Sequence, residues 1–325
     1  MEISRLNASS LLPGLFVAED GSAGAANFSD WIAAHHDRIE SALAEHGALL
    51  MRGVGIRTPL EFALVCGSIY PRLRSYRGGD SPRTELVDKV FTSTDYGAEH
   101  EVLLHNELSY AGWSPQRVMF GCLVAPLTGG QTHLADGRQV YRALNGAVRD
   151  RFDRKGVAYW QHLRDQNGPP GTGLSWQQTF ETSDPYEVEA YLAESAMEYS
   201  WTTLGIRTCA KHAAAVDHPV TGDRCWHNQA DQWHCRMVSV KDTVGTASVD
   251  KGANGAGRDT LGNHTTFGDG SEIDVKDLEH IREVCRLNEV CFNWMNGDVL
   301  IIDNVMTMHG RKPYKGERQI VVAMA

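Results

Sequence analysis

A histidine followed two residues later by a carboxylate occurs twice in this sequence, as His35 with Asp37 and as His105 with Glu107. On a β-strand, residues i and i+2 point to the same side and can share one metal ion, whereas on a helix they diverge. His35 and Asp37 fall within a predicted amphipathic helix over residues 29–46, while the second pair follows an apolar run typical of a strand. Chance alone gives roughly two such pairs among 14 histidines and 41 acidic residues. The second pair therefore needs support from elsewhere in the chain.

The C-terminal segment supplies that support. A buried strand is predicted over residues 299–302, His309 follows it, and Arg318 opens the next strand nine residues later. Two histidines and one carboxylate on one face can hold Fe(II) and leave positions open for a co-substrate and oxygen. The distal carboxylate of 2-oxoglutarate requires a planar, permanently charged partner, which arginine provides and lysine does not. The alternatives are a hydrogen-bonded core histidine at position 309 and a surface charge at position 318.

Short strands broken by turns, with helices outside them, must position these side chains. Thr58 to Glu61 form a capping box with proline at the first helical position, which predicts a helix to about Tyr70. No GxGxxG or Walker loop supports an alternating βαβ fold. The pattern favours a mainly β fold with flanking helices, a barrel or jelly roll of antiparallel strands. Further helices are predicted over 29–46, 136–152, 185–197 and 275–288, and strands over 48–51, 118–123, 131–134, 290–294, 299–302 and 319–323.

Composition restricts the partners and the compartment. The formal net charge of −10 argues against a nucleic-acid backbone or an anionic membrane as the main partner. No apolar stretch is long enough to span a bilayer, and the N-terminus lacks the pattern of a secretory signal. The seven cysteines are scattered without a CxxC pair, which predicts reduced thiols in the cytoplasm. The oligomeric state is not indicated.

No internal repeat or strong linker divides the chain, so we expect residues 1–325 to form a single domain. Residues 236–274 are rich in Gly, Thr, Asp and Asn, which predicts a long loop. Long loops in compact domains are usually functional lids or disordered segments, and the composition leaves both open.

The sequence resembles the TauD/TfdA family of Fe(II)/2-oxoglutarate dioxygenases, and within it the SyrP-like amino-acid hydroxylases. The resemblance covers about residues 86–325. The order and spacing of its blocks are more specific than any one triplet. These blocks are Phe91–Tyr96, Leu104–Tyr110, Gly129–Thr132 with Asp136, His218–Gly222 leading to Trp226 and Asn228, Asp303–Asn304, and His309–Arg311.

The resemblance implies a double-stranded β-helix of the clavaminate synthase-like type, with His105, Glu107 and His309 as the metal ligands. It also implies that Thr132 and Arg318 bind 2-oxoglutarate, although Arg318 follows His309 at a shorter spacing than in some relatives. Related halogenases lack the carboxylate, so Glu107 points to hydroxylation or another oxidation. Relatives often carry an arginine where this chain has Gln161, and that departure would favour a different substrate.

We therefore expect an Fe(II)-dependent oxygenase that uses 2-oxoglutarate and O₂ to hydroxylate an unactivated C–H bond. The substrate implied is a small molecule, an amino acid that is free or tethered to a carrier protein, in a specialised biosynthetic pathway. Asn228 is a candidate substrate contact or a turn-stabilising side chain, and Arg311 binds a substrate carboxylate or pairs with Asp303. Desaturation and cyclisation are alternative outcomes. A zinc hydrolase and a jelly-roll binding protein without chemistry are the alternative classes, and Thr132 with Arg318 argues against the former.

Overall fold

A large, mostly antiparallel sheet forms the centre of the computed structural model, which describes residues 2–7, 10–18, 24–81, 83–93, 96–168, 173–237 and 262–325. Only β2 and β3 run parallel. In spatial order the strands are β1 (Ser4–Asn7), β2 (Ser10–Val17), β3 (Ala48–Arg52), β17 (Val299–Asp303), β7 (Arg117–Val124), β20 (Gln319–Met324), β5 (Val90–Thr92) and β4 (Glu85–Val87).

A smaller antiparallel sheet faces the first and carries the candidate ligands. Its order is β16 (Glu289–Phe292), β9 (Thr132–Asp136), β18 (Thr307–Arg311) and β6 (Val102–His105). Alternate residues of the large sheet, such as Phe120 and Leu300, share one buried cluster with Leu134 and Phe292 of the small sheet. This is the arrangement of a jelly roll, and the predicted β fold with flanking helices is confirmed.

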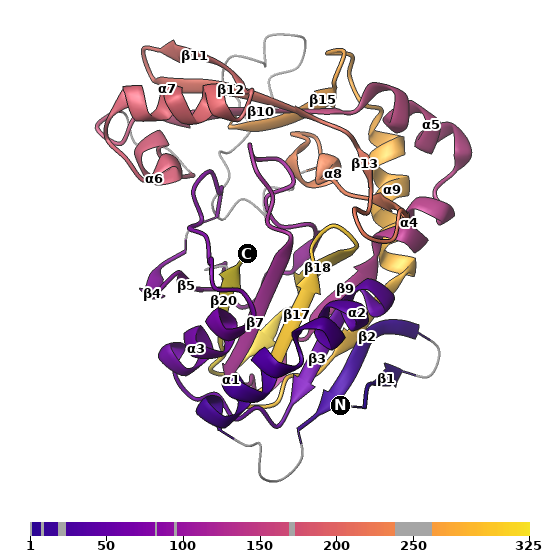
Figure 1. The fold of residues 1–325 in the computed structure, drawn as a ribbon. Helices are drawn as coiled ribbons and strands as arrows, with labels where there is room; N and C mark the ends of the chain where they lie inside the picture. Colours follow the sequence, from indigo (N-terminus) through magenta and orange to yellow (C-terminus); the bar gives the residue numbers. More distant parts are fainter. Residues whose placement is uncertain are drawn as a thin grey trace.

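The outer face of the large sheet is covered by three helices, which lie along its lower part in Figure 1. These are α1 (Ala25–Ala34), α2 (His36–His46) and α3 (Pro59–Ile69). Leu49, Ile301 and Val321, one position out of step with the inward residues, pack with Phe28 and Phe62 of these helices. Because both faces of the sheet are covered, β17 is apolar and buried along most of its length.

A third layer closes one end of the jelly roll, at the top of Figure 1. Its sheet has the order β11 (Glu198–Thr202), β12 (Gly205–His212), β10 (Val157–Arg164) and β15 (Asn263–Phe267). The remaining elements are α4 (Gly137–Ala143), α5 (Gly146–Lys155), α6 (Trp176–Phe180), α7 (Pro185–Glu194), α8 (Ala230–Trp233), α9 (Val275–Leu287), the hairpin β13 (Ala215–Asp217) with β14 (Arg224–Trp226), and the pair β8 (Thr128–Gly129) with β19 (Tyr314–Lys315).

Several local predictions are confirmed and several are wrong. The capping box at Thr58 is present and α3 ends within a residue of the predicted position. The predicted helix over 29–46 is interrupted at His35, and the one over 136–152 is divided because Asn145 caps a new helix. The predicted loop over 236–274 contains β15, and its residues 238–261 lie outside the described part of the chain.

Two further features agree with the composition. None of the helices in the described segments is long and apolar enough to cross a membrane. All seven cysteines are free thiols, as their scattered positions predict.

Candidate metal centre

His105 and His309 face each other across two neighbouring strands. They are direct register partners between β6 and β18, and their ring centroids are 4.5 Å apart. The carboxylate Oε2 of Glu107 lies 3.6 Å from Nε2 of His309. One ligand atom from each of the three residues lies within 4.8 Å of the others. The structure thus brings together the three residues that the sequence singles out.

Glu107 does not reach this position in the way the alternation argument predicts. Strand β6 ends at His105, and the chain then turns, with Leu108 at a φ of +54°. The turn is held by Asn304, whose Oδ1 accepts from the backbone N–H of Glu107 at 2.7 Å and whose Nδ2 donates to the Glu107 carbonyl at 3.0 Å. The side chain of Asn106 in turn donates to the carbonyl of Asn304 at 2.7 Å.

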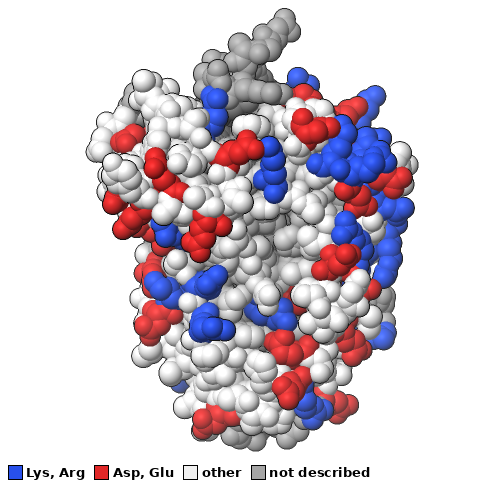
Figure 2. Space-filling view, turned by 45° about the horizontal axis from the view of Figure 1, so that its top comes forward, with Lys and Arg blue, Asp and Glu red and all other residues white. Residues whose placement is uncertain are grey.

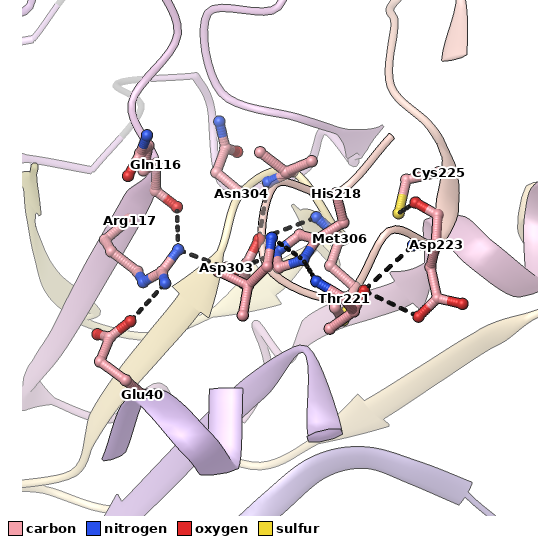
Figure 3. A network of polar contacts seen from close by, with 12 residues as sticks. Glu40, Gln116, Arg117, His218, Thr221, Asp223, Cys225, Asp303, Asn304 and Met306 are labelled. Atoms are coloured by element: carbon pink, nitrogen blue, oxygen red, sulfur yellow. Dashed lines mark hydrogen bonds and ion pairs between the residues drawn. The ribbon is translucent and has the colours of Figure 1, made fainter. Parts of the chain in front are cut away.

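Asn304 is itself fixed by the network around Asp303, drawn in Figure 3. The buried carboxylate of Asp303 accepts from Arg117 at 2.8 Å, lies 3.0 Å from Nε2 of His218, and accepts from the backbone N–H groups of Val305 and Met306. Two blocks of the sequence resemblance, the one at His218 and the one at Asp303, therefore meet here and position the candidate metal ligands indirectly.

The protonation state of His105 suits a metal ligand. Its Nδ1–H donates to the carbonyl of Leu103 at 2.8 Å, which leaves the Nε2 lone pair free. Burial, reinforced by the nearby His309, lowers the pKa of His105 to about 3, so the ring is neutral near pH 7. Two imidazoles with one carboxylate are the donor set that fits Fe(II).

Arg83, which no sequence pattern singles out, holds the third candidate ligand. Its Nη2 donates to Oε2 of Glu107 at 2.9 Å, and both side chains are almost fully buried. Burial opposes ionisation of Glu107, but the charge of Arg83 outweighs it and holds the pKa of Glu107 below its usual value. The guanidinium also lies over the ring of Tyr76, 4.1 Å from its centroid. Nε and Nη1 of Arg83 have no hydrogen-bond partner among the described residues.

Arg318 lies near the triad without an acidic partner in the described part of the chain. Its only hydrogen bonds there are long ones, from Nε to the carbonyl of Gly130 at 3.3 Å and from Nη1 to Oγ of Ser93 at 3.5 Å. Burial and the neighbouring Arg311 lower the pKa of Arg318 to about 10, so it remains charged at neutral pH. Gly130 adopts a φ of +65°, and a side chain there would press on Arg318. A half-buried guanidinium without an acidic partner among the described residues can bind the carboxylate of a ligand.

Thr132 completes this end of the site. Its Oγ1 accepts from the indole N–H of Trp294 at 3.0 Å, so its own hydroxyl hydrogen remains to be donated. A pocket joins His105 and His309 of the triad to this region, and it is lined by Arg83, Ser93, Val102, His105, Phe120, Thr132, His309, Gly310, Arg311, Arg318 and Ile320.

The two residues predicted as substrate contacts make internal bonds. Arg311 lines the pocket, but its guanidinium donates to the carbonyls of Tyr96, Gly97 and His100, and not to Asp303 as the alternative proposed. Asn228 donates to the carbonyl of Ala214 at 2.7 Å and accepts from the N–H of Ala230 at 3.0 Å, the arrangement of a turn-stabilising side chain. Their roles toward a substrate stay predictions.

Gln161 lies in a second pocket, between the upper layer and the jelly roll. This pocket of about 310 Å³ is mostly aromatic and small, with Tyr110, Tyr159, Phe180, Tyr191 and Trp233 in its wall. Acidic and basic side chains are interspersed over the face of the molecule in Figure 2, so the negative net charge is not gathered into one patch there.

Comparisons with known proteins agree with this geometry. The family described as "Taurine catabolism dioxygenase TauD, TfdA family" matches residues 8–324. The chain is 32% identical to the dapdiamide synthesis protein DdaC of Enterobacter agglomerans over 290 residues, 89% of this chain and 85% of that protein. It is 26% identical to a clavaminate synthase-like protein of Arabidopsis thaliana over 302 residues, 91% and 87% of the two chains.

Solved structures share the fold at low identity. AAD-2 in complex with Mn(II) and N-oxalylglycine matches with a TM-score of 0.56 and 14% identity, covering 100% of this chain and 96% of that one. PvcB, an iron- and α-ketoglutarate-dependent oxygenase from an isonitrile synthetic pathway, matches with a TM-score of 0.53 and 13% identity over 97% and 86% of the chains.

Proposed function

Because this chain belongs to the TauD/TfdA family of iron(II)- and 2-oxoglutarate-dependent dioxygenases, we propose that it hydroxylates an unactivated C–H bond of an amino acid. The amino acid is free or tethered to a carrier protein, and the product serves a specialised biosynthetic pathway in the cytoplasm. Residues 1–325 act as one catalytic domain of the SyrP-like type. Family membership excludes the zinc hydrolase and the binding protein without chemistry.

The metal is assigned to His105, Glu107 and His309. Iron(II), with 2-oxoglutarate and oxygen, supplies the oxidising power that no side chain has. The protein supplies geometry. The Leu103 carbonyl fixes the tautomer of His105, and Asn304 fixes the backbone of Glu107. Arg83 binds Oε2 of Glu107, which limits the freedom of that carboxylate and leaves neighbouring positions for other ligands.

The co-substrate is assigned to the Arg318 end of the pocket. The observation that carries this assignment is a half-buried guanidinium with no acidic partner among the described residues, in the same pocket as the triad. A distal carboxylate of 2-oxoglutarate would pair with Arg318, and the hydroxyl of Thr132 would donate to the same molecule. The apolar wall at Phe120 and Ile320 would exclude water from the intervening carbon chain.

Two features support an amino-acid substrate. The similar protein DdaC is named for dapdiamide synthesis. Arg83 lines the pocket beside the triad with two N–H groups, Nε and Nη1, that have no partner in the described part of the chain. The family resemblance implies an arginine at the position of Gln161 in many relatives. Because Gln161 is uncharged, a substrate carboxylate would pair with Arg83 instead. A carrier-tethered aminoacyl group has no free carboxylate, so Arg83 also distinguishes the two substrate forms.

The test is a substrate screen with the iron-loaded enzyme. Free amino acids and carrier-loaded aminoacyl groups are each incubated with 2-oxoglutarate and oxygen, and succinate and product mass are measured. We expect substrate-dependent succinate and a product heavier by one oxygen atom. A product lighter by two hydrogen atoms would replace hydroxylation by desaturation or cyclisation. Failure of every amino-acid form, with another carbon acid or amide turned over, would overturn the substrate class.

A further inference from the structure

A second cluster of metal-binding side chains lies away from the triad, where α8 meets β15. His234 follows α8, Cys235 is the next residue, and His264 lies on β15. One ligand atom from each lies within 4.8 Å of the others, a limit that the three residues of the triad also satisfy. The rings of His234 and His264 are tilted against each other with centroids 4.8 Å apart.

His234 gives the independent sign of a ligand. Its side chain is 1% exposed, and its Nε2 has no hydrogen-bond partner among the described residues. The other ring nitrogen, Nδ1, accepts one long hydrogen bond, 3.4 Å, from the backbone N–H of Arg236. A buried ring nitrogen without a partner is unfavourable in a folded protein, and coordination to a cation satisfies it.

His264 is oriented as a metal ligand would be. Its Nε2 lies 3.3 Å from the carboxylate of Glu272, while its Nδ1 accepts a long hydrogen bond, 3.5 Å, from the backbone N–H of Cys235. A carboxylate that binds the far nitrogen of a ligating histidine fixes the ring and raises its basicity, which is the common arrangement behind zinc-bound histidines.

A third cluster of similar residues shows what a structural ion-pair network looks like in the same protein. Glu101, His133 and Glu289 also converge, but Lys312 lies among them, 2.7 Å from the carboxylate of Glu101 and 2.8 Å from that of Glu289. Both ring nitrogens of His133 are engaged as well. No lysine or arginine side chain of the described segments hydrogen-bonds to His234 or Cys235, although the charge of Arg236 acts on both from the next position in the chain.

We propose that His234, Cys235 and His264 bind a second divalent metal ion, of the zinc class, at the junction of α8 and β15. One thiolate and two imidazoles are the donors that favour zinc, and a water molecule would fill the fourth position. Tetrahedral zinc places such donors about 3.3–3.6 Å apart, and the three ligand atoms already lie within 4.8 Å of one another. Burial raises the pKa of the Cys235 thiol, and therefore binding forms the Zn–S bond and releases that proton to solvent.

The proposed ion would stabilise one wall of the second pocket, the one that contains Gln161. Trp233, the residue before His234, lines that pocket and packs against Tyr110 and Tyr159 with ring centroids 4.2 Å and 5.6 Å away. An ion that joins the end of α8 to β15 fixes the backbone that carries Trp233. The ion would therefore rigidify a pocket wall, and it does not take part in the oxygen chemistry of the triad.

Cobalt(II) provides a test that separates the two metal sites. The protein, stripped of metal, is titrated with Co²⁺ under reducing, anaerobic conditions, and the near-ultraviolet sulfur-to-cobalt charge-transfer band is followed. The iron triad contains no sulfur, so only a site with Cys235 gives the band. We expect one equivalent of cobalt to produce it, zinc to abolish it by competition, and its midpoint to move to higher metal concentration as the pH falls.

Variants decide the assignment. Cys235→Ser should lose the band, because cysteine is the sole sulfur donor of the site, and it should still bind one equivalent of metal at the triad. Cys291→Ser, which removes an exposed thiol elsewhere, should keep the band, as should His309→Ala. His264→Gln should weaken it while circular dichroism remains that of the parent. A parent protein without the band, or a band that survives Cys235→Ser, would overturn the proposal.

Discussion

The two faces of the small sheet carry nearly the same residue types, but their polar groups are bonded to different partners. On the inner face, His105 and His309 pair across β6 and β18, next to Glu107. On the outer face, one residue out of step, His133 of β9 lies opposite Gly310 and next to Glu289. Each face thus has histidine and carboxylate groups close enough to hold one ion.

What separates the faces is where the protein places its own cations. On the outer face, Lys312 bridges Glu101 and Glu289 and occupies the centre of the cluster. On the inner face, Arg83 donates to Oε2 of Glu107 and lies over the ring of Tyr76, and Nε2 of His105 has no hydrogen bond to any described residue. Residue type alone does not make a metal site. A metal site also requires lone pairs that point toward one place and are not already used in hydrogen bonds.

The largest expected effect comes from the inner face. His309→Ala should abolish iron binding and turnover, because a glutamate and one histidine hold iron poorly, and His105→Ala should do the same. The matched control is His133→Ala on the outer face, which should keep one equivalent of iron and lose stability by about 1–3 kcal/mol as its partners lose a buried hydrogen bond. Iron content by elemental analysis and thermal unfolding measure both. Equal iron loss in the two variants would contradict the comparison.

Glu107 should give the next largest effect. Glu107→Ala removes the charge and leaves Arg83 without its carboxylate, so we expect weak iron binding and little succinate. Glu107→Asp retracts the carboxylate by one methylene and should retain partial activity. Both are assayed for iron affinity, succinate and product mass, with and without chloride, since the family resemblance implies that related halogenases lack this carboxylate. An Ala variant as active as the parent would assign the third ligand elsewhere.

The sequence was sufficient for the parts of the site that depend on local pattern. His105 and His309 could be found from residue type next to apolar strands, and the jelly roll from short strands with outer helices. The conformation of Glu107 could not, because it depends on Asn304, 197 residues away. Nor could Arg83, which lies outside any periodic element and meets Glu107 only in the fold. The strands β10 and β12 were missed, since each mixes charged and apolar residues without a clean alternation.

Arg318 tests the co-substrate end of the inner face. Arg318→Lys should raise the 2-oxoglutarate requirement roughly tenfold to a hundredfold, because a point charge replaces a bidentate partner at a cost of about 1.5–3 kcal/mol. Iron affinity should not change. The control is Arg311→Lys, whose parent side chain is held by three backbone carbonyls, so its loss should lower stability more than co-substrate affinity. The Kd for 2-oxoglutarate, measured by calorimetry on the anaerobic iron complex, checks both. An effect only in the Arg311 variant would transfer the role to that residue.

The smallest effect should come from removing the cation of the outer face. Lys312→Met leaves Glu101 and Glu289 facing each other near His133. We expect the free energy of unfolding to fall by about 1 kcal/mol at pH 7, a modest value because both carboxylates are partly exposed. Burial opposes ionisation of Glu289, but hydrogen bonds from Lys312 and His133 outweigh it and hold the pKa of Glu289 below its usual value. A lowered folded-state pKa means that this stabilisation is present above the unfolded pKa and is lost as the pH falls through the folded one. The difference in free energy of unfolding between parent and variant should therefore shrink as the solution is acidified below about pH 4.

The same variant tests whether Lys312 prevents metal binding at the outer face of the small sheet. Without the ammonium group, two carboxylates and an imidazole remain at ligand spacing, so Mn²⁺ or Zn²⁺ should raise the melting temperature of Lys312→Met more than that of the parent. Adding His133→Gln to this variant should remove the extra metal effect, because the amide is a poor substitute for imidazole. If metal stabilises the parent and the Lys312 variant equally, the lysine is not the distinguishing feature. The difference between the two faces would then rest on the orientation of the imidazoles, whose Nδ1 and Nε2 are both engaged in His133 but not in His105.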